Sequence, residues 1–202
     1  MHFSLVDTSF GYVTIIHRDI LTAGVVGVLL PRTKMDAIRA VKSKFPEAQQ
    51  SSSNVLESLE TMLLDYFNGE PVKFPLDVLD LSMCYPFQID VLKAEWSIPY
   101  GKVAPYRCVA RKIGSTANRA VGNALARNPF PIIIPCHRAI RSDRTLGGFQ
   151  GGLKMKRRIL EMEGVEFDAL GRVRKDFIDT HLDSLYDYFT SSQYVNTFNG
   201  TF

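Results

Sequence analysis

A proline-rich segment, residues 128–140 with the sequence NPFPIIIPCHRAI, constrains this chain more than any other feature. Each proline fixes its own φ angle and lacks a backbone N–H group, so few conformations are open to the segment. The β-branched run Ile132–Ile134 between two prolines predicts a buried strand. That strand would deliver Cys136, which His137 follows directly. The segment therefore predicts a cysteine held rigidly next to a histidine.

Charge is divided unevenly along the chain. The net charge of the whole chain is +3, yet residues 100–176 contain 16 Lys and Arg against 6 Asp and Glu, so the remainder is acidic. A basic half joined to an acidic half indicates that one face meets a polyanion. A solubilising surface of mixed charge is the alternative.

Length and cysteine usage are those of an ordinary reduced, globular protein. The 202 residues, 46% of them hydrophobic, suffice for one large domain or two small ones. The three cysteines include no CxxC pair, and no apolar run approaches the roughly 18 residues of a membrane span. The N-terminus lacks the layout of a signal peptide. We expect a cytoplasmic protein, or a nuclear one in a eukaryote, without a membrane partner.

Residues 1–84 are predicted to form a small α/β domain. Short β-branched runs between residues 3 and 30 indicate two or three strands, with Pro31 as their end. Helical spacing follows in TKMDAIRAVKSKF and in SSSNVLESLETMLLDYFNGE, the second with Ser and Asn as capping signals and Gly69 as its stop. The Gln- and Ser-rich stretch 47–54 between them is expected to be a mobile loop.

Residues 85–176 are predicted to form a second, mainly helical domain, followed by a tail at 177–202. Apolar spacing indicates helices in PFQIDVLKAEWSIPYG and GGLKMKRRILEMEG. Their inward faces are expected to carry Phe87, Val91, Leu92 and Trp96 in the first and Leu153, Ile159 and Met162 in the second. The second also has a basic cluster, made of Lys154, Lys156, Arg157 and Arg158. HLDSLYDYF in the tail is expected to be a short docked helix with a frayed end.

Two further helices, YRCVARKIG and ANRAVGNALAR, are joined by a short turn and resemble a helix-turn-helix. Small and apolar residues recur on one face of the second helix, namely Ala117, Ala120, Val121, Ala124 and Leu125. Its other face carries Arg119, Asn123 and Arg127, and Arg119 lies in the first turn, where DNA-reading helices place contacting side chains. An ordinary helical hairpin with solvated arginines is the alternative.

Cys136 is the candidate nucleophile, whereas Cys84 and Cys108 lie among apolar neighbours as inert packing residues do. His137 and Arg138 favour a thiolate over the unperturbed thiol pKa near 8.5. Adjacent side chains of an extended chain point to opposite faces, so His137 needs a bridging water or a turn to act on the sulfur. An acidic partner that orients the ring is expected from the following helix, where the candidates are Glu161 and Glu163.

Four motifs between residues 86 and 166, taken in order, resemble the O6-alkylguanine-DNA alkyltransferase family: IPYGKVAPY, RAVGNALARNP, IPCHRAI and GGFQGGLKMKRRILEMEG. The N-terminal region is similar to that family only in layout. The resemblance implies a small, ribonuclease-H-like α/β N-terminal domain and a mainly α C-terminal domain with a helix-turn-helix. It also implies direct-reversal DNA repair, in which the alkyl group of O6-alkylguanine moves irreversibly to Cys136, once per molecule.

The same resemblance implies a role for each catalytic residue. Cys136 attacks the alkyl carbon, while His137 draws the thiol proton through a water and is polarised by Glu163. Asn128 is the hinge between the recognition helix and the active-site segment. Tyr106 crowds the 3′ phosphate of the flipped nucleotide and is the candidate proton donor to the departing guanine.

DNA contacts are implied for a helix that enters the minor groove, where Arg119 fills the gap left by the flipped nucleotide. The implied DNA-binding set is Tyr106, Arg107, Ser115, Thr116, Ala117, Arg119, Asn123, Arg127 and Ser142. The implied substrate pocket is bordered by Pro135, Arg138, Phe149, Gln150 and Gly151. Phe149 and Gln150 stand where many relatives have Tyr and Ser, which predicts an altered tolerance for bulky alkyl groups.

Double-stranded DNA carrying O6-alkylguanine is the partner that the resemblance implies, with O4-alkylthymine as a further candidate lesion. A monomer is expected, and cooperative binding on DNA is left open. No cofactor and no metal are expected, since the N-terminal region lacks the cysteines that hold zinc in some relatives. Three alternatives are a lesion-binding protein without transferase activity, a helix-turn-helix regulator and a cysteine hydrolase. Cys136 disfavours the first, the missing metal–cysteine domain the second, and the Cys–His adjacency the third.

Overall fold

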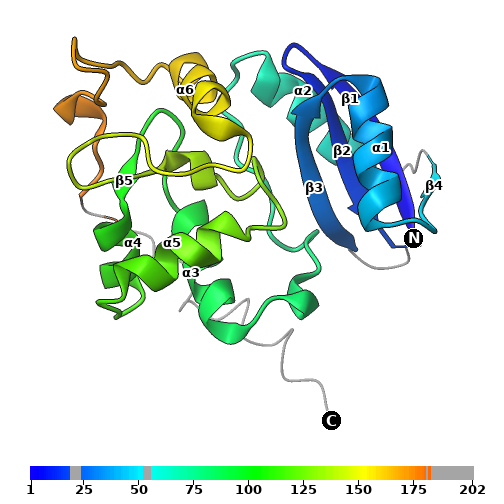
Figure 1. Ribbon diagram of the computed structural model, residues 1–202, viewed down its shortest axis with the longest axis horizontal. Helices are drawn as coiled ribbons and strands as arrows, with labels where there is room; N and C mark the ends of the chain where they lie inside the picture. The colour runs from blue at the N-terminus through cyan, green and yellow to red at the C-terminus, as the bar shows by residue number, and fades with distance from the viewer. Residues whose placement is uncertain (19–23, 52–55, 181, 183–202) are drawn as a thin grey trace.

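The computed structural model of the chain describes residues 1–18, 24–51, 56–180 and 182. The fold is mixed α/β, with a sheet and two helices in the N-terminal part and mostly helices and irregular segments in the C-terminal part (Figure 1). Among the described residues, no helix has both the length and the apolar character that crossing a bilayer requires.

The sheet has four strands in the order β3-β2-β1-β4. Strands β1 (His2–Thr8), β2 (Gly11–His17) and β3 (Val25–Arg32) pair antiparallel, while the short β4 (Gln49–Gln50) pairs parallel with β1. The prediction of strands between residues 3 and 30 is confirmed. The end predicted at Pro31 is slightly wrong, because β3 continues to Arg32.

Helices α1 (Lys34–Lys44) and α2 (Glu57–Phe67) cover opposite faces of this sheet. Thr33 caps α1 by accepting a hydrogen bond from the Asp36 amide, and α2 ends before Gly69, which has φ +94° as its stop signal requires. The loop expected at 47–54 is wrong at Gln49–Gln50, which form β4 against β1. Residues 52–54 of that stretch, with most of the Ser and Asn capping signals for α2, lie outside the described residues.

The C-terminal part contains four α-helices among the described residues: α3 (Pro86–Trp96), α4 (Tyr106–Lys112), α5 (Asn118–Ala126) and α6 (Gly152–Met162). Short 3₁₀ turns lie at Leu81–Met83, Cys136–Arg138 and Lys175–Phe177, and β5 (Ala104–Pro105) pairs parallel with β6 (Ala139–Ile140). The helix expected at HLDSLYDYF lies outside the described residues apart from Leu182, which is buried.

The inward faces of these helices differ from the prediction in three places. Ala117 is exposed, because it caps α5 instead of packing under it. Leu153 is 56% exposed at the start of α6, where Ile159 and Leu160 supply the buried face. Lys156 of the predicted basic cluster is fully buried, whereas Lys154, Arg157 and Arg158 are exposed.

One hydrophobic core connects the two halves. It contains Val13 and Ile15 of the sheet, Leu63 of α2 and, from the C-terminal part, Val121 of α5 and Ile159 of α6. Because α2 packs against both the sheet and the C-terminal part, residues far apart in sequence meet along its inner face. The active-site candidates lie close to this junction.

Candidate active site

The segment that carries Cys136 is buried, but it is not the predicted strand. Ile132 has a φ of +78° and reverses the chain, and the Ile134 amide donates to the Phe130 carbonyl at 2.8 Å. Asn128 closes this turn, since its side chain accepts from the Phe130 amide at 2.9 Å and donates to the Ile134 carbonyl at 2.9 Å. The strand prediction failed because these local hydrogen bonds outweigh the β preference of isoleucine.

Cys136, His137 and Arg138 form one turn of 3₁₀ helix. All three side chains are buried, with exposed fractions of 5%, 0% and 6%. The turn points adjacent side chains in different directions, so the Cys136 sulfur borders the cavity while the His137 imidazole contacts Glu163. The backbone turns at Cys136, but the imidazole makes no hydrogen bond to the sulfur among the described residues, so a bridging water between them is still required.

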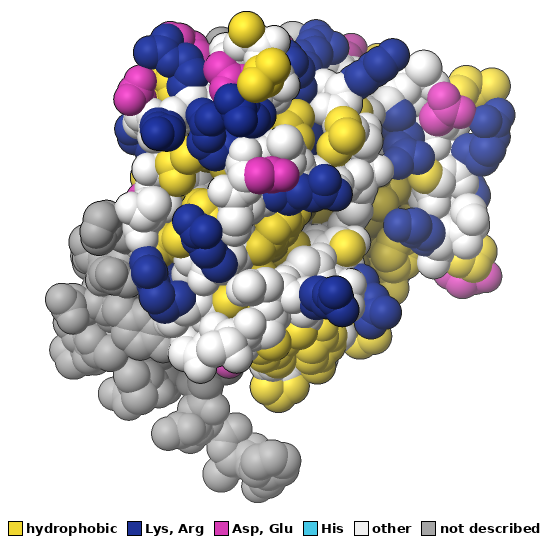
Figure 2. Space-filling model, turned by 60° about the vertical axis from the view of Figure 1, so that its left-hand side comes forward, with side chains coloured by type: hydrophobic (Ala, Val, Ile, Leu, Met, Phe, Trp, Pro, Cys, Tyr) yellow, Lys and Arg dark blue, Asp and Glu magenta, His cyan; other side chains and the backbone are white. Residues whose placement is uncertain are grey.

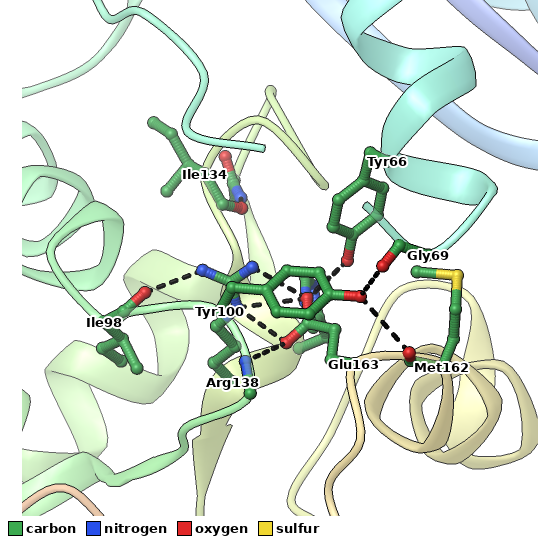
Figure 3. Close-up of polar contacts among 11 residues, drawn as sticks. Tyr66, Gly69, Ile98, Tyr100, Ile134, Arg138, Met162 and Glu163 are labelled. Atoms are coloured by element: carbon green, nitrogen blue, oxygen red, sulfur yellow. Dashed lines mark hydrogen bonds and ion pairs between the residues drawn. The ribbon is translucent and has the colours of Figure 1, made fainter. Parts of the chain in front are cut away.

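Glu163, directly after α6, is the acidic partner of the imidazole. His137 Nε2 lies 2.8 Å from Glu163 Oε1, whereas Glu161 is exposed and pairs with Arg157. Arg138 donates to the same carboxylate from Nε (3.0 Å to Oε2) and Nη2 (2.8 Å to Oε1), and from Nη1 to the Ile98 carbonyl at 2.7 Å (Figure 3). Burial alone would raise the pKa of Glu163, but His137 and Arg138 lower it to about 2.

The hydrogen bond to Glu163 assigns the proton of the neutral imidazole to Nε2. Burial lowers the pKa of His137, an effect that the Glu163 charge partly offsets, so the ring is neutral near pH 7. Its Nδ1 is buried and has no hydrogen-bond partner among the described residues. That nitrogen is therefore a free proton acceptor.

The Cys136 thiol is protonated at rest. Burial raises its pKa to about 11, although the Asn128 amide and the Lys156 charge lower it in part. The expectation that His137 and Arg138 favour a thiolate is wrong, because both side chains are committed to Glu163. A thiol of this kind needs a base to remove its proton as it reacts.

A cavity of about 370 Å³ opens beside the sulfur. Its lining residues are Tyr106, Gly122, Leu125, Ala126, Cys136, Arg141, Gly147, Gly148, Phe149 and Gln150. Burial raises the pKa of Tyr106 to about 12, helped by Glu95 and Cys136, so its hydroxyl remains a hydrogen-bond donor. A side chain at Gly147 would place Cβ 2.4 Å from the Tyr106 hydroxyl, so glycine there makes room for the tyrosine. The volume lies in the range of small-molecule sites.

The structure brings only part of the predicted pocket to this cavity. Phe149 and Gln150 line it, and Gln150 Nε2 donates to the Asn128 carbonyl at 2.7 Å. Pro135 and Arg138 instead line a separate cavity of about 210 Å³. Gly151 precedes α6 and is not among the residues that line the cavity; a Cβ there would meet Met155, Phe149 and Leu30.

Most of the predicted DNA-binding residues lie on α4, on α5 with its C-cap Arg127, and in the turn between the helices, whereas Ser142 lies in the turn after β6. Arg107, Thr116, Ala117, Arg119, Asn123, Arg127 and Ser142 are exposed, and Tyr106 and Ser115 are half-buried. Ser115 Oγ accepts from the Ala117 amide at 3.1 Å and so shapes the turn. Figure 2 shows Lys and Arg side chains spread over this side of the molecule, with few Asp or Glu.

Three buried polar residues near the cysteine were missed by the sequence analysis. Lys156 Nζ donates to the Ala139 carbonyl at 2.5 Å, and burial lowers its pKa to about 8. Both carboxyl oxygens of Glu95 are buried without a hydrogen-bond partner among the described residues, and burial raises the pKa of that group to about 8. Tyr66 was predicted only as part of the apolar stripe of α2. Glu95 could have been noticed, since it lies three and four residues after Leu92 and Val91 on the core face.

Fold and site together define a class of protein in which a buried thiol borders a small cavity, next to a neutral histidine held by a carboxylate and a basic helical surface. A family model for the DNA-binding domain of 6-O-methylguanine DNA methyltransferase matches residues 86–165. The methylated-DNA–protein-cysteine methyltransferase of Methanothermobacter thermautotrophicus is 50% identical over 104 residues, which are 52% of this chain and 58% of that protein.

Solved structures extend the similarity over most of the chain. The O6-methylguanine methyltransferase of Mycobacterium tuberculosis is 32% identical, with a TM-score of 0.63 over 80% of this chain and 92% of that one. The OGT protein of the same organism in complex with DNA is 31% identical, with a TM-score of 0.65 over 81% and 92%. The chain belongs to the O6-methylguanine DNA methyltransferase family. Its match spans 58% and 64% of the length of the first two curated relatives.

Proposed function

We propose that this protein repairs DNA by direct reversal, accepting the alkyl group of O6-alkylguanine on Cys136 in a single, irreversible transfer. The observation that carries the proposal is the Cys136 sulfur on the wall of the 370 Å³ cavity, served by the buried His137–Glu163 pair. The curated relative from Methanothermobacter thermautotrophicus is named for methyl transfer from DNA to a protein cysteine.

The proposed reaction moves one alkyl group and one proton. As the Cys136 proton passes through a water to Nδ1 of His137, the sulfur forms a bond to the alkyl carbon and the carbon–O6 bond breaks. Its electron pair leaves on the guanine, which takes a proton from the Tyr106 hydroxyl. Tyr106 regains a proton from water and the His137 imidazolium releases the one it took, so the net transfer is one alkyl group and one proton. Glu163 stabilises the imidazolium that forms. A thioether is not hydrolysed in water, so the protein reacts once.

On the DNA side, we propose that α4 and α5 act as a helix-turn-helix that enters the minor groove. The exposed Arg119 in the first turn of α5 would occupy the place of the flipped nucleotide, while Tyr106 at the start of α4 crowds its 3′ phosphate. The proposal includes a ribonuclease-H-like N-terminal domain at 1–84, an active domain at 85–176, and binding as a monomer.

The test is mass spectrometry of the protein after incubation with a duplex containing O6-methylguanine. One added methyl group on the Cys136 peptide, with one guanine restored per protein molecule, is expected. A repaired duplex without a modified cysteine would point to another chemistry. Tight binding of the duplex with an unmodified Cys136 peptide would favour the lesion-binding alternative. A parallel duplex with O4-methylthymine tests the second candidate lesion.

A further inference from the structure

We infer that Tyr66, which belongs to helix α2 of the N-terminal part, is a positioning residue for the Cys136 reaction: its hydroxyl holds Glu163 and, through it, the His137 ring. The inference rests on the proposed function and adds a residue that lies outside the matched segment 86–165. It makes the reactive thiol depend on the N-terminal half of the chain.

The contacts of Tyr66 place its hydroxyl at the centre of the buried network. The hydroxyl donates to Glu163 Oε1 at 2.6 Å and lies 3.2 Å from His137 Nε2. The whole tyrosine is buried, with no exposed surface. Figure 3 shows it extending from α2 towards Glu163, where the bonds from Arg138 also converge.

The hydroxyl can act only as a donor to the carboxylate. Burial, with the Glu163 charge, raises the pKa of Tyr66 well above its usual value, so the phenol keeps its proton. Glu163 Oε1 then accepts from Tyr66, from Nε2 of His137 and from Nη2 of Arg138. Each of these bonds restricts the rotation of the carboxylate, and the orientation of the carboxylate restricts the ring of His137.

The direction of the hydroxyl is set by packing that does not involve Glu163. Edge-on rings surround Tyr66, with centroid separations of 5.1 Å to Phe67, 5.7 Å to Phe74 and 6.2 Å to Tyr100. These aromatic contacts hold the tyrosine in place before any substrate arrives. The orientation of Tyr66 therefore does not depend on its bond to Glu163, and the tyrosine can position the carboxylate.

The expected signature is a change in how the thiol reaction depends on pH. The titratable and charged groups that face the imidazole network are Tyr66, Glu95, Tyr100, Arg138, Lys156 and Glu163. Tyr66→Phe removes one donor and leaves the rest in place. The His137 relay would then lose alignment near neutral pH, whereas hydroxide takes the thiol proton directly at high pH.

The experiment compares Tyr66→Phe with Tyr100→Phe. Tyr100 is a matched control, because its hydroxyl also bonds to the N-terminal half, at the Gly69 carbonyl (2.8 Å), and to the Met162 carbonyl (3.3 Å), whereas it makes no hydrogen bond to Glu163 or His137 among the described residues. Rates of Cys136 modification by O6-methylguanine duplex and by iodoacetamide are measured by mass spectrometry from pH 6.5 to 9.5. Circular dichroism records the melting temperature of each variant.

For Tyr66→Phe we expect a rate about tenfold lower near pH 7 that approaches the wild-type rate at pH 9.5, with both reagents. Tyr100→Phe should stay within about twofold of wild type throughout. In a Glu163→Gln background, the tyrosine change should have no further effect, because it acts through that carboxylate. The inference would be overturned if Tyr66→Phe reacted at the wild-type rate, or if its rate were lowered by the same factor at every pH. It would also be overturned if the effects of Tyr66→Phe and Glu163→Gln on the rate were additive in the double variant.

Two further readouts keep the inference testable. If Tyr66→Phe melts below the assay temperature, 3,5-difluorotyrosine at position 66 replaces it, because this residue keeps the hydroxyl as a stronger hydrogen-bond donor. The ¹⁵N chemical shifts of the His137 ring should then change. Unchanged shifts would overturn the inference. If the wild-type protein takes no methyl group from DNA but its iodoacetamide profile depends on Tyr66, the proposed function fails and the positioning role stands.

Discussion

Nε2 of His137 lies 2.8 Å from Oε1 of Glu163, and neither side chain exposes any surface. This pair fixes the tautomer of the ring and leaves Nδ1 free on the other side. Because the Cys136 thiol has a pKa raised to about 11, its reactivity depends on that free nitrogen. The pair therefore connects the stability of the fold to the chemistry of the cysteine.

Replacing Glu163 by Gln should destabilise the protein mostly above pH 4.5. The folded pKa of about 2 lies below the ordinary value of 4.5 for a glutamate, so the carboxylate contributes stability above pH 4.5 that is lost as the pH falls towards 2. We expect the free energy of unfolding at pH 7 to fall by about 3 kcal/mol, since Arg138 keeps a buried charge without its partner. Urea unfolding from pH 2.5 to 7 measures the free energy of unfolding and its dependence on pH in the wild type and the variant. An equally steep pH dependence in the variant would contradict the lowered pKa of Glu163.

Replacing Lys156 by Met should slow the reaction of the Cys136 thiol with an alkylating reagent. The ammonium of Lys156 lowers the pKa of Cys136, and its own pKa of about 8 means that it is charged at pH 7. We expect iodoacetamide to modify Cys136 on the order of tenfold more slowly at pH 7, with a smaller difference above pH 8. Lys154→Met, an exposed neighbour on the same helix, should behave as wild type. Equal rates for all three proteins would exclude an electrostatic role.

Replacing Gly147 by Ala should displace Tyr106. The new Cβ would lie 2.4 Å from the tyrosine hydroxyl, so that side chain must move. We expect methyl transfer from duplex DNA to slow by about tenfold, consistent with the loss of a positioned proton donor. Gly148→Ala is the matched control, because nothing lies within 4 Å of its Cβ. Comparable losses in the two variants would show that the loop backbone, not the contact with Tyr106, is responsible.

Replacing Arg119 by Ala should separate DNA repair from the chemistry of the thiol. The side chain is exposed on α5, away from the His137–Glu163 pair. We expect transfer from duplex O6-methylguanine to fall at least tenfold, while reaction with free O6-benzylguanine changes by less than about twofold. Arg39→Ala, in α1, is the control. Equal losses on both substrates would argue against a base-flipping role.

The predictions from sequence were most successful where the pattern is local. The apolar spacing of α1, α3 and α5 and the stop at Gly69 gave elements close to those observed, because helical periodicity and capping depend on nearby residues. The β-branched run at Ile132–Ile134 misled, since Asn128 and two prolines impose a turn.

For the site, the order of motifs identified Cys136, His137 and Glu163 as candidates from the chain alone. Sequence by itself determined which nucleophile, histidine and carboxylates the protein possesses. Residue patterns left Glu161 and Glu163 open and the family resemblance implied Glu163; the tertiary structure shows Glu163 bonded to His137, whereas Glu161 pairs with Arg157. The raised pKa of Cys136 and the arrival of Tyr66 from α2 also follow only from the packing of the two halves. Burial and contacts between distant segments set those properties, and neither is written in local sequence.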